Sequence, residues 1–342
     1  MRPQVFANPS SLSHGWYWAL PSQKLAVGAK VPLELFGRQL LLYRGKSGKA
    51  YALDSFCQHM GANLKEGEVE GDSIRCGFHG WKYSGNGDGT EASGAKCRAR
   101  KQTCFPLVER YGMLWIHSRP EAECLDPFPS FPALEGKELT VLVDEPEHRR
   151  CHHTLILGGG VDEEHFRFVH HGTTKATGPL HFKHSRVSPA VIQFWNDAPI
   201  PRLSWQNRLM HFIYRGVLNY RVTYWYASTA LAELGSSHLP LYSIFAYRPT
   251  AEGKTLGINL YLTPRRTGLC GRLISAFALR LTRRILRKGG QEDARIQNSM
   301  RFQFGPRTLS DASFAAFVSY VEEQPHFAIL PDAQRESGVG NS

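Results

Sequence analysis

The chain has 342 residues, of which 42% are hydrophobic and 21% are charged, a composition typical of a folded globular protein. It excludes a disordered or collagen-like chain, and the length predicts about two domains. Lys and Arg outnumber Asp and Glu by 41 to 30, so the net charge of +11 predicts an acidic partner, whether nucleic acid, membrane or protein. No nucleic-acid-binding motif accompanies this charge, so we expect no nucleic-acid partner.

The N-terminal segment and the cysteines set an expectation for the cellular compartment. Residues 1–10 lack the apolar core of a secretory signal, and no uncharged apolar run approaches the roughly 18 residues that a spanning helix needs. The seven cysteines are too few for a disulfide scaffold. We therefore expect a cytoplasmic protein whose cysteines bind metal or remain free thiols.

Short strands separated by glycine-containing turns dominate the first part of the chain, and this rhythm is typical of an all-β domain. Strands are expected over residues 31–36, 39–43, 50–53, 105–108 and 113–117, with a glycine-rich loop over 57–90. Three prolines over residues 127–132 indicate a linker. We predict a first domain over residues 10–125 and a linker over 126–136.

The remaining chain, residues 137–333, combines helical and strand patterns and is predicted to be a second domain. Aromatic and β-branched stretches over 203–263 suit an antiparallel sheet. Apolar residues at helical spacing (Ile274, Phe277, Leu281, Ile285) predict a helix over 269–288, which Gly289-Gly290 is expected to end. Further helical segments are expected over 151–171, 292–303 and 312–323, and a frayed polar tail over 334–342. The fold class is α+β.

Two short motifs, Cys57-Gln-His59 and Cys76-Gly-Phe-His79, each combine one thiol with one imidazole. Such a set can hold a [2Fe–2S] cluster, with two cysteines on one iron and two histidines on the other. Gly61, Gly77 and Gly80 beside the ligands would let backbone N–H groups approach the cluster sulfurs. A structural zinc ion is the alternative, but zinc sites usually pair Cys with Cys and His with His along the chain.

The stretch from Cys57 to Tyr83 resembles the Rieske domain of non-haem iron oxygenases, most closely the branch that includes 3-ketosteroid hydroxylases and sterol desaturases. It differs from the respiratory-chain Rieske protein, which has an additional disulfide-forming cysteine in each loop. Cys97 and Cys104 fall after the second loop and are interpreted as structural thiols. No role is assigned to the other cysteines, Cys124, Cys151 and Cys270.

A second constellation lies in Asp162-Glu-Glu-His165-Phe-Arg-Phe-Val-His170. Asp162 and His165 are three residues apart and share a face of a helix. His165 and His170 are five residues apart, about 500° of helical turn, so a π-type turn or a helix break is needed to align them. Two imidazoles and one carboxylate form the facial triad of non-haem Fe(II), which leaves coordination positions open for O₂.

The resemblance to the oxygenases assigns a role to each residue of this constellation. It implies that His165 and His170 bind the iron, and that Asp162 is the bridging aspartate that links a catalytic histidine to a cluster histidine of the neighbouring subunit in a trimer. Relatives place the third ligand at the start of a late helix, which Asp293 fits, although capping that helix is its structural alternative. The other candidates are Asp311 and Glu292 for the carboxylate and His171 for a histidine.

Several nearby residues receive a structural interpretation. Gly158-Gly-Gly160 stands where relatives commonly carry asparagine or glutamate, which removes any polar role from these positions. His152 and His153 are interpreted as surface or core histidines. Several aromatic residues could line an apolar pocket, but the core of the sheet is the preferred interpretation. They are Trp205, Phe212, Tyr214, Tyr224 and Trp225.

Two basic segments are candidates for partner binding. The run over residues 96–101 is interpreted as a solvated loop or as a docking surface for an acidic ferredoxin. A second cluster lies on the helix over 269–288, whose apolar face suits the core or, alternatively, a membrane surface; its members are Arg280, Arg283, Arg284, Arg287 and Lys288. No Gly-x-Gly-x-x-Gly follows a strand, so we expect no NADH or flavin site in the chain.

The resemblance implies the oxygenase component of a Rieske non-haem iron oxygenase. Its expected fold is an antiparallel-β Rieske domain followed by a helix-grip catalytic domain, in a head-to-tail homotrimer. Electrons would pass from NAD(P)H through a separate flavin reductase or ferredoxin to the [2Fe–2S] cluster and then to Fe(II), which would activate O₂ and monooxygenate a hydrophobic, polycyclic or steroid-like molecule. The alternatives are oxygenation, dihydroxylation, demethylation or desaturation of a smaller aromatic or natural product, a Rieske electron-transfer protein without oxygenase activity, and a zinc-structured binding protein.

Overall fold

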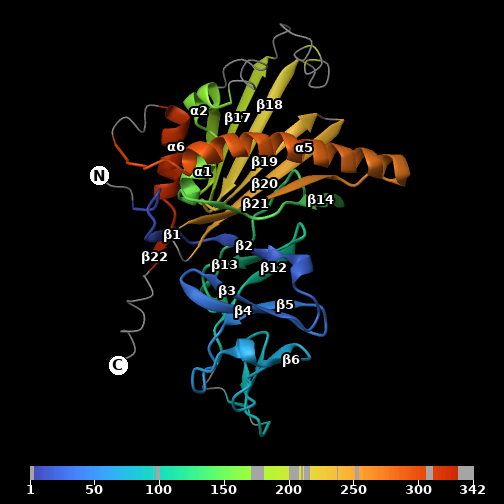
Figure 1. Ribbon diagram of the computed structural model, residues 1–342, viewed down its shortest axis with the longest axis vertical. Helices are drawn as coiled ribbons and strands as arrows, with labels where there is room; N and C mark the ends of the chain where they lie inside the picture. The colour runs from blue at the N-terminus through green and yellow to red at the C-terminus, as the bar shows by residue number, and fades with distance from the viewer. Residues whose placement is uncertain are drawn as a thin grey trace. The chain divides into compact units, whose positions relative to one another are not determined.

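The computed structural model shows how these segments fold. It describes residues 4–94, 96–97, 101–170, 181–199, 208, 211, 216–236, 238–250, 254–305 and 311–329. Within them the chain forms two compact units (Figure 1). The small unit contains residues 14–128, and the large unit contains the described residues of 4–13, 129–249 and 254–327.

The division between the units differs in two ways from the predicted domain limits. Residues 10–13, expected in the first domain, belong to the large unit, where β1 (Ser11–Ser13) pairs with β22 (His326–Ala328). The proline-rich segment predicted as a linker is also partly packed: Phe131 is buried, and its ring lies edge-on to Trp225 with centroids 4.4 Å apart. The tail predicted over 334–342 lies outside the described residues.

The small unit consists of three antiparallel sheets in the described residues, with strand orders β11-β5-β4-β3, β12-β13-β2 and β10-β9-β8-β7-β6. The first two sheets contain the predicted strands, with that over 105–108 divided into β11 and β12, and also β2, which was not predicted. The bounds are β2 (Trp16–Pro21), β3 (Lys30–Leu35), β4 (Arg38–Arg44), β5 (Ala50–Asp54), β11 (Cys104–Phe105), β12 (Leu107–Arg110) and β13 (Met113–His117). The short 3-10 helices are Ser22–Lys24, Leu64–Glu66 and Glu121–Glu123.

The third sheet of the small unit lies mostly in the segment predicted as loop, so that prediction is wrong there. Its strands are β6 (Glu68–Glu70), β7 (Ser73–Arg75), β8 (Lys82–Ser84), β9 (Gly89–Thr90) and β10 (Lys96–Cys97). Each has only two or three residues. Alternation of apolar and polar residues cannot be recognised over so short a run.

The large unit contains an eight-stranded antiparallel sheet. Six successive strands, β16 to β21, pair each with the next, while β14 and β15 add to β21 at the far edge. The bounds are β14 (Leu139–Val143), β15 (Glu147–Arg149), β16 (Lys183–Ser188), β17 (Val191–Pro199), β18 (Val217–Trp225), β19 (Thr229–Ser236), β20 (Leu239–Pro249) and β21 (Thr255–Pro264). The sheet predicted over 203–263 is confirmed where the chain is described.

Helices pack on this sheet, and the longest of them runs across its strands (Figure 1). They are α1 (His153–Gly158), α2 (Glu163–Phe168), α5 (Gly268–Gln297) and α6 (Ala312–Glu322). Within the part of the chain that the structure describes, no helix is long and apolar enough to cross a membrane. Together with the small unit, this architecture confirms the α+β class.

The N-terminal segment is held by α6, far along the sequence. Glu322 accepts hydrogen bonds from the backbone N–H groups of Gln4, Val5 and Phe6 at 2.6–3.0 Å. The Phe6 ring is buried and lies edge-on to Phe314, with centroids 5.7 Å apart. Residues 4–13 therefore complete the core of the large unit.

The glycine pair at 289–290 does not end the long helix, because α5 continues to Gln297. Each internal glycine costs only about 1 kcal/mol relative to alanine, which packing of the helix on the sheet offsets. Asp293 consequently lies near the C-terminal end of α5, where the helix dipole does not favour a carboxylate. The capping alternative for Asp293 is therefore wrong, as is the separate helix predicted over 292–303, whereas α6 confirms the one predicted over 312–323.

Close packing explains the three glycines at 158–160. A Cβ on Gly158 would lie 2.8 Å from Cε2 of Phe314, and one on Gly160 would lie 2.7 Å from the Tyr224 hydroxyl oxygen. Real Cβ atoms are not found at such distances, so a larger residue would force α1 away from α6 and β18. The glycines therefore allow the segment that leads into α2 to lie close to the core.

The Gly158→Ala variant is expected to lose about 1–3 kcal/mol of unfolding free energy through overpacking against Phe314. Helix propensity alone would give the opposite sign, a gain of up to about 1 kcal/mol. Urea unfolding followed by circular dichroism measures the difference. The matched control is Gly290→Ala in α5, whose Cβ would lie 3.6 Å from the nearest atom, an ordinary contact; equal stabilisation of both variants would contradict the packing argument.

Candidate metal centres

The second constellation is positioned by the N-terminus of α2. Asp162 caps this helix, because its Oδ1 accepts a hydrogen bond from the backbone N–H of His165 at 2.8 Å. This bond places His165 in the first turn. The helix ends at Phe168, so His170 lies beyond a helix break. The break lets His165 and His170 face the same side despite their five-residue spacing, and no π-type turn is needed.

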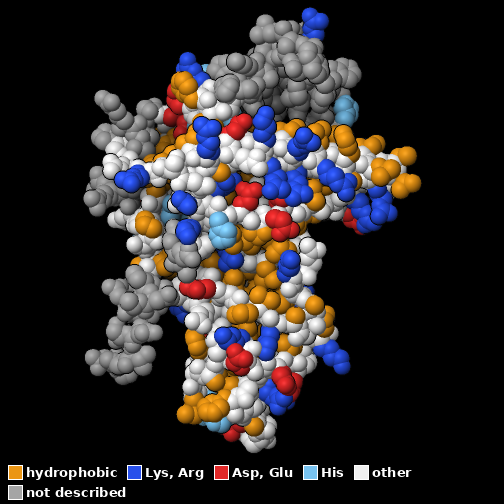
Figure 2. Space-filling view, in the orientation of Figure 1, with side chains coloured by type: hydrophobic (Ala, Val, Ile, Leu, Met, Phe, Trp, Pro, Cys, Tyr) orange, Lys and Arg blue, Asp and Glu red, His pale blue; other side chains and the backbone are white. Residues whose placement is uncertain are grey.

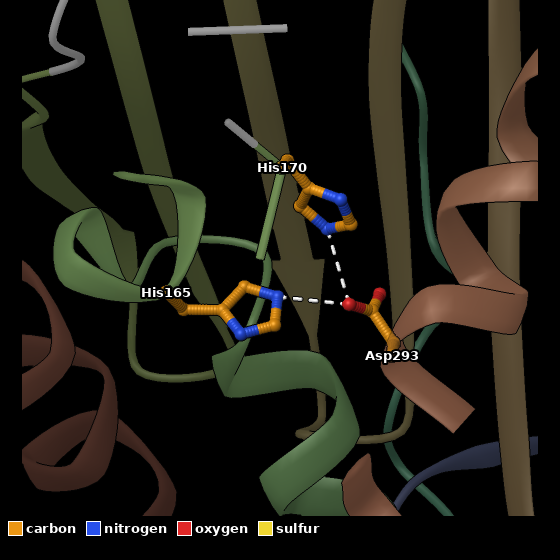
Figure 3. A group of neighbouring side chains, drawn as sticks. All are labelled: His165, His170 and Asp293. Atoms are coloured by element: carbon orange, nitrogen blue, oxygen red, sulfur yellow. Dashed lines mark ion pairs between the residues drawn. The ribbon is translucent and has the colours of Figure 1, made fainter. Parts of the chain in front are cut away.

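The side chains of His165, His170 and Asp293 converge on one point (Figure 3). Nε2 of His165 lies 3.0 Å, and Nε2 of His170 3.1 Å, from the same carboxylate oxygen, Oδ1 of Asp293. The two imidazole planes are nearly perpendicular, at 84°, with centroids 5.0 Å apart. The structure thus brings together residues that are up to 128 positions apart in the sequence.

These three residues fit a divalent transition-metal ion. Two donor atoms each about 2.1 Å from one ion, at right angles to each other, lie about 3.0 Å apart, as the two histidine–carboxylate pairs do. Oδ1 of Asp293 is buried, and no described group donates a hydrogen bond of normal geometry to it. Burial raises the pKa of Asp293, but the contacts with His165 and His170 outweigh this effect and bring its pKa to about 2, so the carboxylate is ionised. Two imidazoles and one carboxylate form the donor set of non-haem Fe(II) sites.

Glu292 supports this site as a neighbour of a candidate ligand. Its Oε2 lies 3.3 Å from Nδ1 of His170, the ring nitrogen that faces away from Asp293. A carboxylate on the second nitrogen fixes the orientation of a metal-binding imidazole. Gly289 also lies beside this ring, since a Cβ there would be 3.6 Å from Cε1 of His170. Glu292 is thus placed to orient His170, whereas Asp293 faces both histidines.

Other candidates are occupied elsewhere. Oδ1 of Asp311 accepts from the backbone N–H groups of Ser313 and Phe314 and caps α6, while its Oδ2 accepts from that of Glu163. His152 caps α1 and His153 is buried, which confirms their structural interpretation. His171 lies outside the described residues.

The preferred core interpretation of the aromatic residues is confirmed for the two that the structure describes, and other aromatic residues lie beside the metal centre. Tyr224 and Trp225 are buried in the core, and Trp205, Phe212 and Tyr214 lie outside the described residues. Phe166, Phe182 and Tyr220 instead contact one another, with centroids 5.7–6.1 Å apart, and the Phe166 ring lies 5.5 Å from that of His170. Only Phe166 had a signal in the sequence, its position inside the histidine motif.

The two cysteine–histidine motifs of the small unit fold into matching loops. In each loop the cysteine carbonyl accepts from the glycine four positions later, Gly61 for Cys57 at 2.8 Å and Gly80 for Cys76 at 3.1 Å. Both glycines have φ of +72°, in the left-handed region that favours glycine. The two loops therefore present their thiols from equivalent backbone positions.

Across the two loops the thiols of Cys57 and Cys76 interact with each other, and the imidazoles of His59 and His79 lie side by side. Cys57 and Cys76 are buried and form no disulfide. Burial raises the pKa of the Cys76 thiol. The backbone N–H groups of Phe78 and His79 act in the opposite direction and lower this pKa, because they stabilise the thiolate. The rings of His59 and His79 have centroids 4.8 Å apart. A pair of buried thiols and a pair of neighbouring imidazoles from the same two loops, with N–H groups directed at a sulfur, fit a [2Fe–2S] cluster.

Two aromatic residues support these loops. The His59 ring stacks on Trp81 with centroids 4.9 Å apart, and the Tyr83 hydroxyl lies 3.1 Å from Sγ of Cys57. Of the cysteines without an assigned role, Cys104 and Cys151 are buried thiols, Cys124 is half-buried and Cys270 is exposed. The side chain of Cys97, like most of the basic run over 96–101, lies outside the described residues.

Comparison with known proteins agrees with this geometry. Residues 15–108 match the Rieske [2Fe-2S] domain family. The 3-ketosteroid-9-alpha-monooxygenase oxygenase component of Rhodococcus rhodochrous is 30% identical over 173 residues, 48% of this chain and 45% of the relative. The cholesterol 7-desaturase of Caenorhabditis elegans is 31% identical over 244 residues, 65% of this chain and 52% of the relative. The chain thus spans about half the length of the curated relatives that it matches.

Solved structures share the fold of both units. NdmA of Pseudomonas putida CBB5 with caffeine superposes with a TM-score of 0.66 at 18% identity and covers 89% of this chain and 88% of its own. Dicamba monooxygenase with non-heme iron and dicamba gives 0.59 at 17% identity and covers 90% of this chain and 95% of its own. The chain therefore contains a Rieske [2Fe–2S] domain at residues 15–108, is similar to an oxygenase component and a desaturase, and shares the fold of NdmA and dicamba monooxygenase.

Proposed function

We propose that this chain is the oxygenase component of a Rieske non-haem iron oxygenase. The observation that carries the proposal is the convergence of two histidine nitrogens on one buried aspartate oxygen, in a chain that also contains a Rieske domain. A protein that only transfers electrons has no use for this second donor set. The small unit is the proposed cluster domain and the large unit the proposed catalytic domain. The proposed ligands are Cys57, His59, Cys76 and His79 for the cluster, and His165, His170 and Asp293 for the iron.

The bound groups would supply single electrons at the cluster and a site for O₂ reduction at the iron. The chain's own residues prepare the second site. Asp293 holds a negative charge between two imidazoles, and Glu292 keeps the far nitrogen of His170 in place. Asp162, whose Oδ1 caps α2, is the proposed link to a cluster histidine of a neighbouring subunit in a homotrimer.

The substrate is proposed to be a hydrophobic small molecule, polycyclic or steroid-like, and the reaction a monooxygenation. The Phe166 ring lies beside His170 and packs on Phe182 and Tyr220, so the surroundings of this histidine are apolar. The relatives named above act on 3-ketosteroid and cholesterol. Oxygenation, desaturation or demethylation of a smaller molecule is the second candidate: one relative is a desaturase, and the two structures that share the fold contain caffeine and dicamba. The electron donor is proposed to be a separate ferredoxin or flavin reductase that is itself reduced by NAD(P)H.

A turnover experiment tests this function. The purified chain is combined with a surrogate reductase, NADH and a panel of steroid and aromatic substrates under ¹⁸O₂, and the products are analysed by mass spectrometry. A product that has gained one ¹⁸O atom, formed only with NADH, is the expected result. A desaturated or demethylated product selects the second candidate. Protein with about two irons per chain and no substrate-dependent O₂ uptake is an electron carrier, and colourless zinc protein overturns the proposal.

Glu292→Gln is expected to weaken Fe(II) binding by about 10–100-fold, because the amide cannot hold the His170 ring as the carboxylate does. Competition with a chelator of known affinity measures this change in apo protein reconstituted with Fe(II). Glu164→Gln is the control: its side chain is exposed and pairs only with Arg167 among the described residues. An affinity unchanged from wild type in Glu292→Gln would mean that the contact with His170 is incidental.

A further inference from the structure

The N-terminal part of α5 exposes a row of large apolar side chains. Its opposite side is buried against the sheet through Ser275, Ala278, Leu279 and Thr282. The exposed row repeats every four residues and therefore forms one ridge along the helix. The members of this apolar ridge, with exposed fractions between 46% and 73%, are Leu269, Leu273, Phe277, Leu281 and Ile285. Core packing, which the sequence favoured for this face, is wrong.

A basic ridge runs beside the apolar one. Its members are the exposed residues Arg272, Arg280, Arg284 and Lys288. No ion pair joins any of these four to a described residue, whereas Arg283 and Arg287 are held by Asp144 at 2.7 and 3.6 Å. The first acidic residue of α5 is Glu292, so the whole segment up to residue 291 carries positive charge only.

The position of the helix leaves both ridges accessible. In Figure 1 the end of α5 that is remote from α2 and the metal centre extends past the strands of the sheet. Figure 2 shows basic side chains along this helix and apolar side chains gathered at its free end. Exposed apolar patches of this kind, with a charged border, mark binding surfaces in folded proteins.

We propose that the apolar and basic ridges of α5 form a peripheral binding surface for membranes that contain anionic phospholipids. A helix with large apolar residues on one side and Lys or Arg beside them lies in the headgroup region of a bilayer, its apolar side chains reaching the acyl boundary. The basic ridge complements acidic headgroups. A second copy of the same surface would set arginine against arginine. An acidic protein would satisfy the charge, but would leave the apolar ridge without an equivalent partner.

This surface does not depend on the proposed function, because none of its residues is a candidate metal ligand. If the proposed substrate class is correct, lipid contact would bring the chain to the phase in which such hydrophobic molecules dissolve. The two proposals fail separately: vesicle binding needs no turnover, and turnover with a water-dispersed substrate needs no vesicles.

Vesicle co-sedimentation of the full chain tests the proposal. Wild-type protein is expected to sediment with vesicles of phosphatidylcholine and phosphatidylglycerol, less with phosphatidylcholine alone, and less as salt increases. Arg280→Gln combined with Arg284→Gln should reduce affinity for the anionic vesicles by about thirtyfold, since each basic residue near such a surface contributes about fivefold. The charge-matched control combines Lys24→Gln with Lys183→Gln, two exposed lysines outside α5, and should bind within about twofold of wild type.

The apolar ridge is tested by Phe277→Ser, with Val187→Ser in β16 as the control for loss of an exposed apolar side chain. Binding should fall only for Phe277→Ser, while thermal unfolding stays unchanged because Phe277 is 68% exposed. Attachment of an environment-sensitive fluorophore to Cys270, an exposed thiol on the same helix, should give a blue shift with anionic vesicles. Wild-type protein that stays in solution with anionic vesicles overturns the proposal. The proposal is also overturned if Phe277→Ser changes the oligomeric mass but not vesicle binding, because this face would then be a subunit interface.

Discussion

Alanine in place of His165 is expected to reduce the iron content from about three atoms per chain to about two and to abolish substrate oxidation. The variant removes one of the two imidazole nitrogens that lie about 3 Å from Oδ1 of Asp293. Acid-labile sulfide and the visible absorption of the cluster should stay unchanged, because the cysteine–histidine loops belong to the other unit. Metal analysis by mass spectrometry, combined with sulfide determination, measures both quantities.

The control for this variant is His184→Ala, an exposed histidine in β16 that lies outside the metal centre. It should keep all the iron and the full activity. If His165→Ala still oxidised substrate, or kept about three irons, the assignment of the mononuclear site would be wrong. Loss of cluster absorption together with the iron would instead indicate that the chain had failed to fold.

Serine in place of Cys76 is expected to give the complementary pattern, with about one iron per chain, no labile sulfide and no visible cluster absorption. It should also destabilise the small unit. Cys57 and Cys76 lie in its buried core with Leu41, Leu53 and Ile74, and the free energy of metal binding contributes to folding in small metal-binding domains. Hydrogen exchange should increase over residues 14–128, while strands of the large unit keep their protection.

Cys124→Ser serves as the control for Cys76→Ser, since Cys124 is a half-buried thiol of the same unit that contacts no candidate cluster ligand. Its iron, sulfide and spectrum should match those of wild type. A Cys76→Ser variant that kept its visible spectrum would exclude Cys76 as a ligand. Zinc in place of iron in the wild-type protein would restore the alternative metal for this motif.

Much of this architecture could be predicted because its signals are local. The long strands of the small unit are largely apolar runs of five to seven residues, and most of the donor residues lie in compact motifs. The resemblance identifies Asp293 as a candidate ligand, but the expected position at the start of a helix is wrong, because Asp293 lies near the C-terminal end of α5. A glycine pair predicts the end of a helix, but whether the helix ends there depends on the groups that it packs against. For Gly289 these groups include the His170 ring.

The rest depends on tertiary contacts that leave no local mark. Glu292 is 122 positions from His170, and Phe182 and Tyr220 come from different strands or strand ends, so only the fold shows that they surround one site. The prediction that the apolar face of α5 packs in the core is wrong for a related reason. Helical periodicity shows that a helix has an apolar side, but it does not show which side faces the sheet.

The anchoring of residues 4–6 by Glu322 has a consequence for the order of synthesis on the ribosome. Residues 14–128 emerge as a complete unit first, while the large unit, begun by residues 4–13, waits for its last helix. At about 5–20 residues per second, the interval between residues 128 and 322 is about 10–40 s. Throughout that time Phe6 has no native partner on α6. A nascent chain halted before α6 would therefore expose the segment around Phe6 to chaperones and proteases, even if the small unit had already folded.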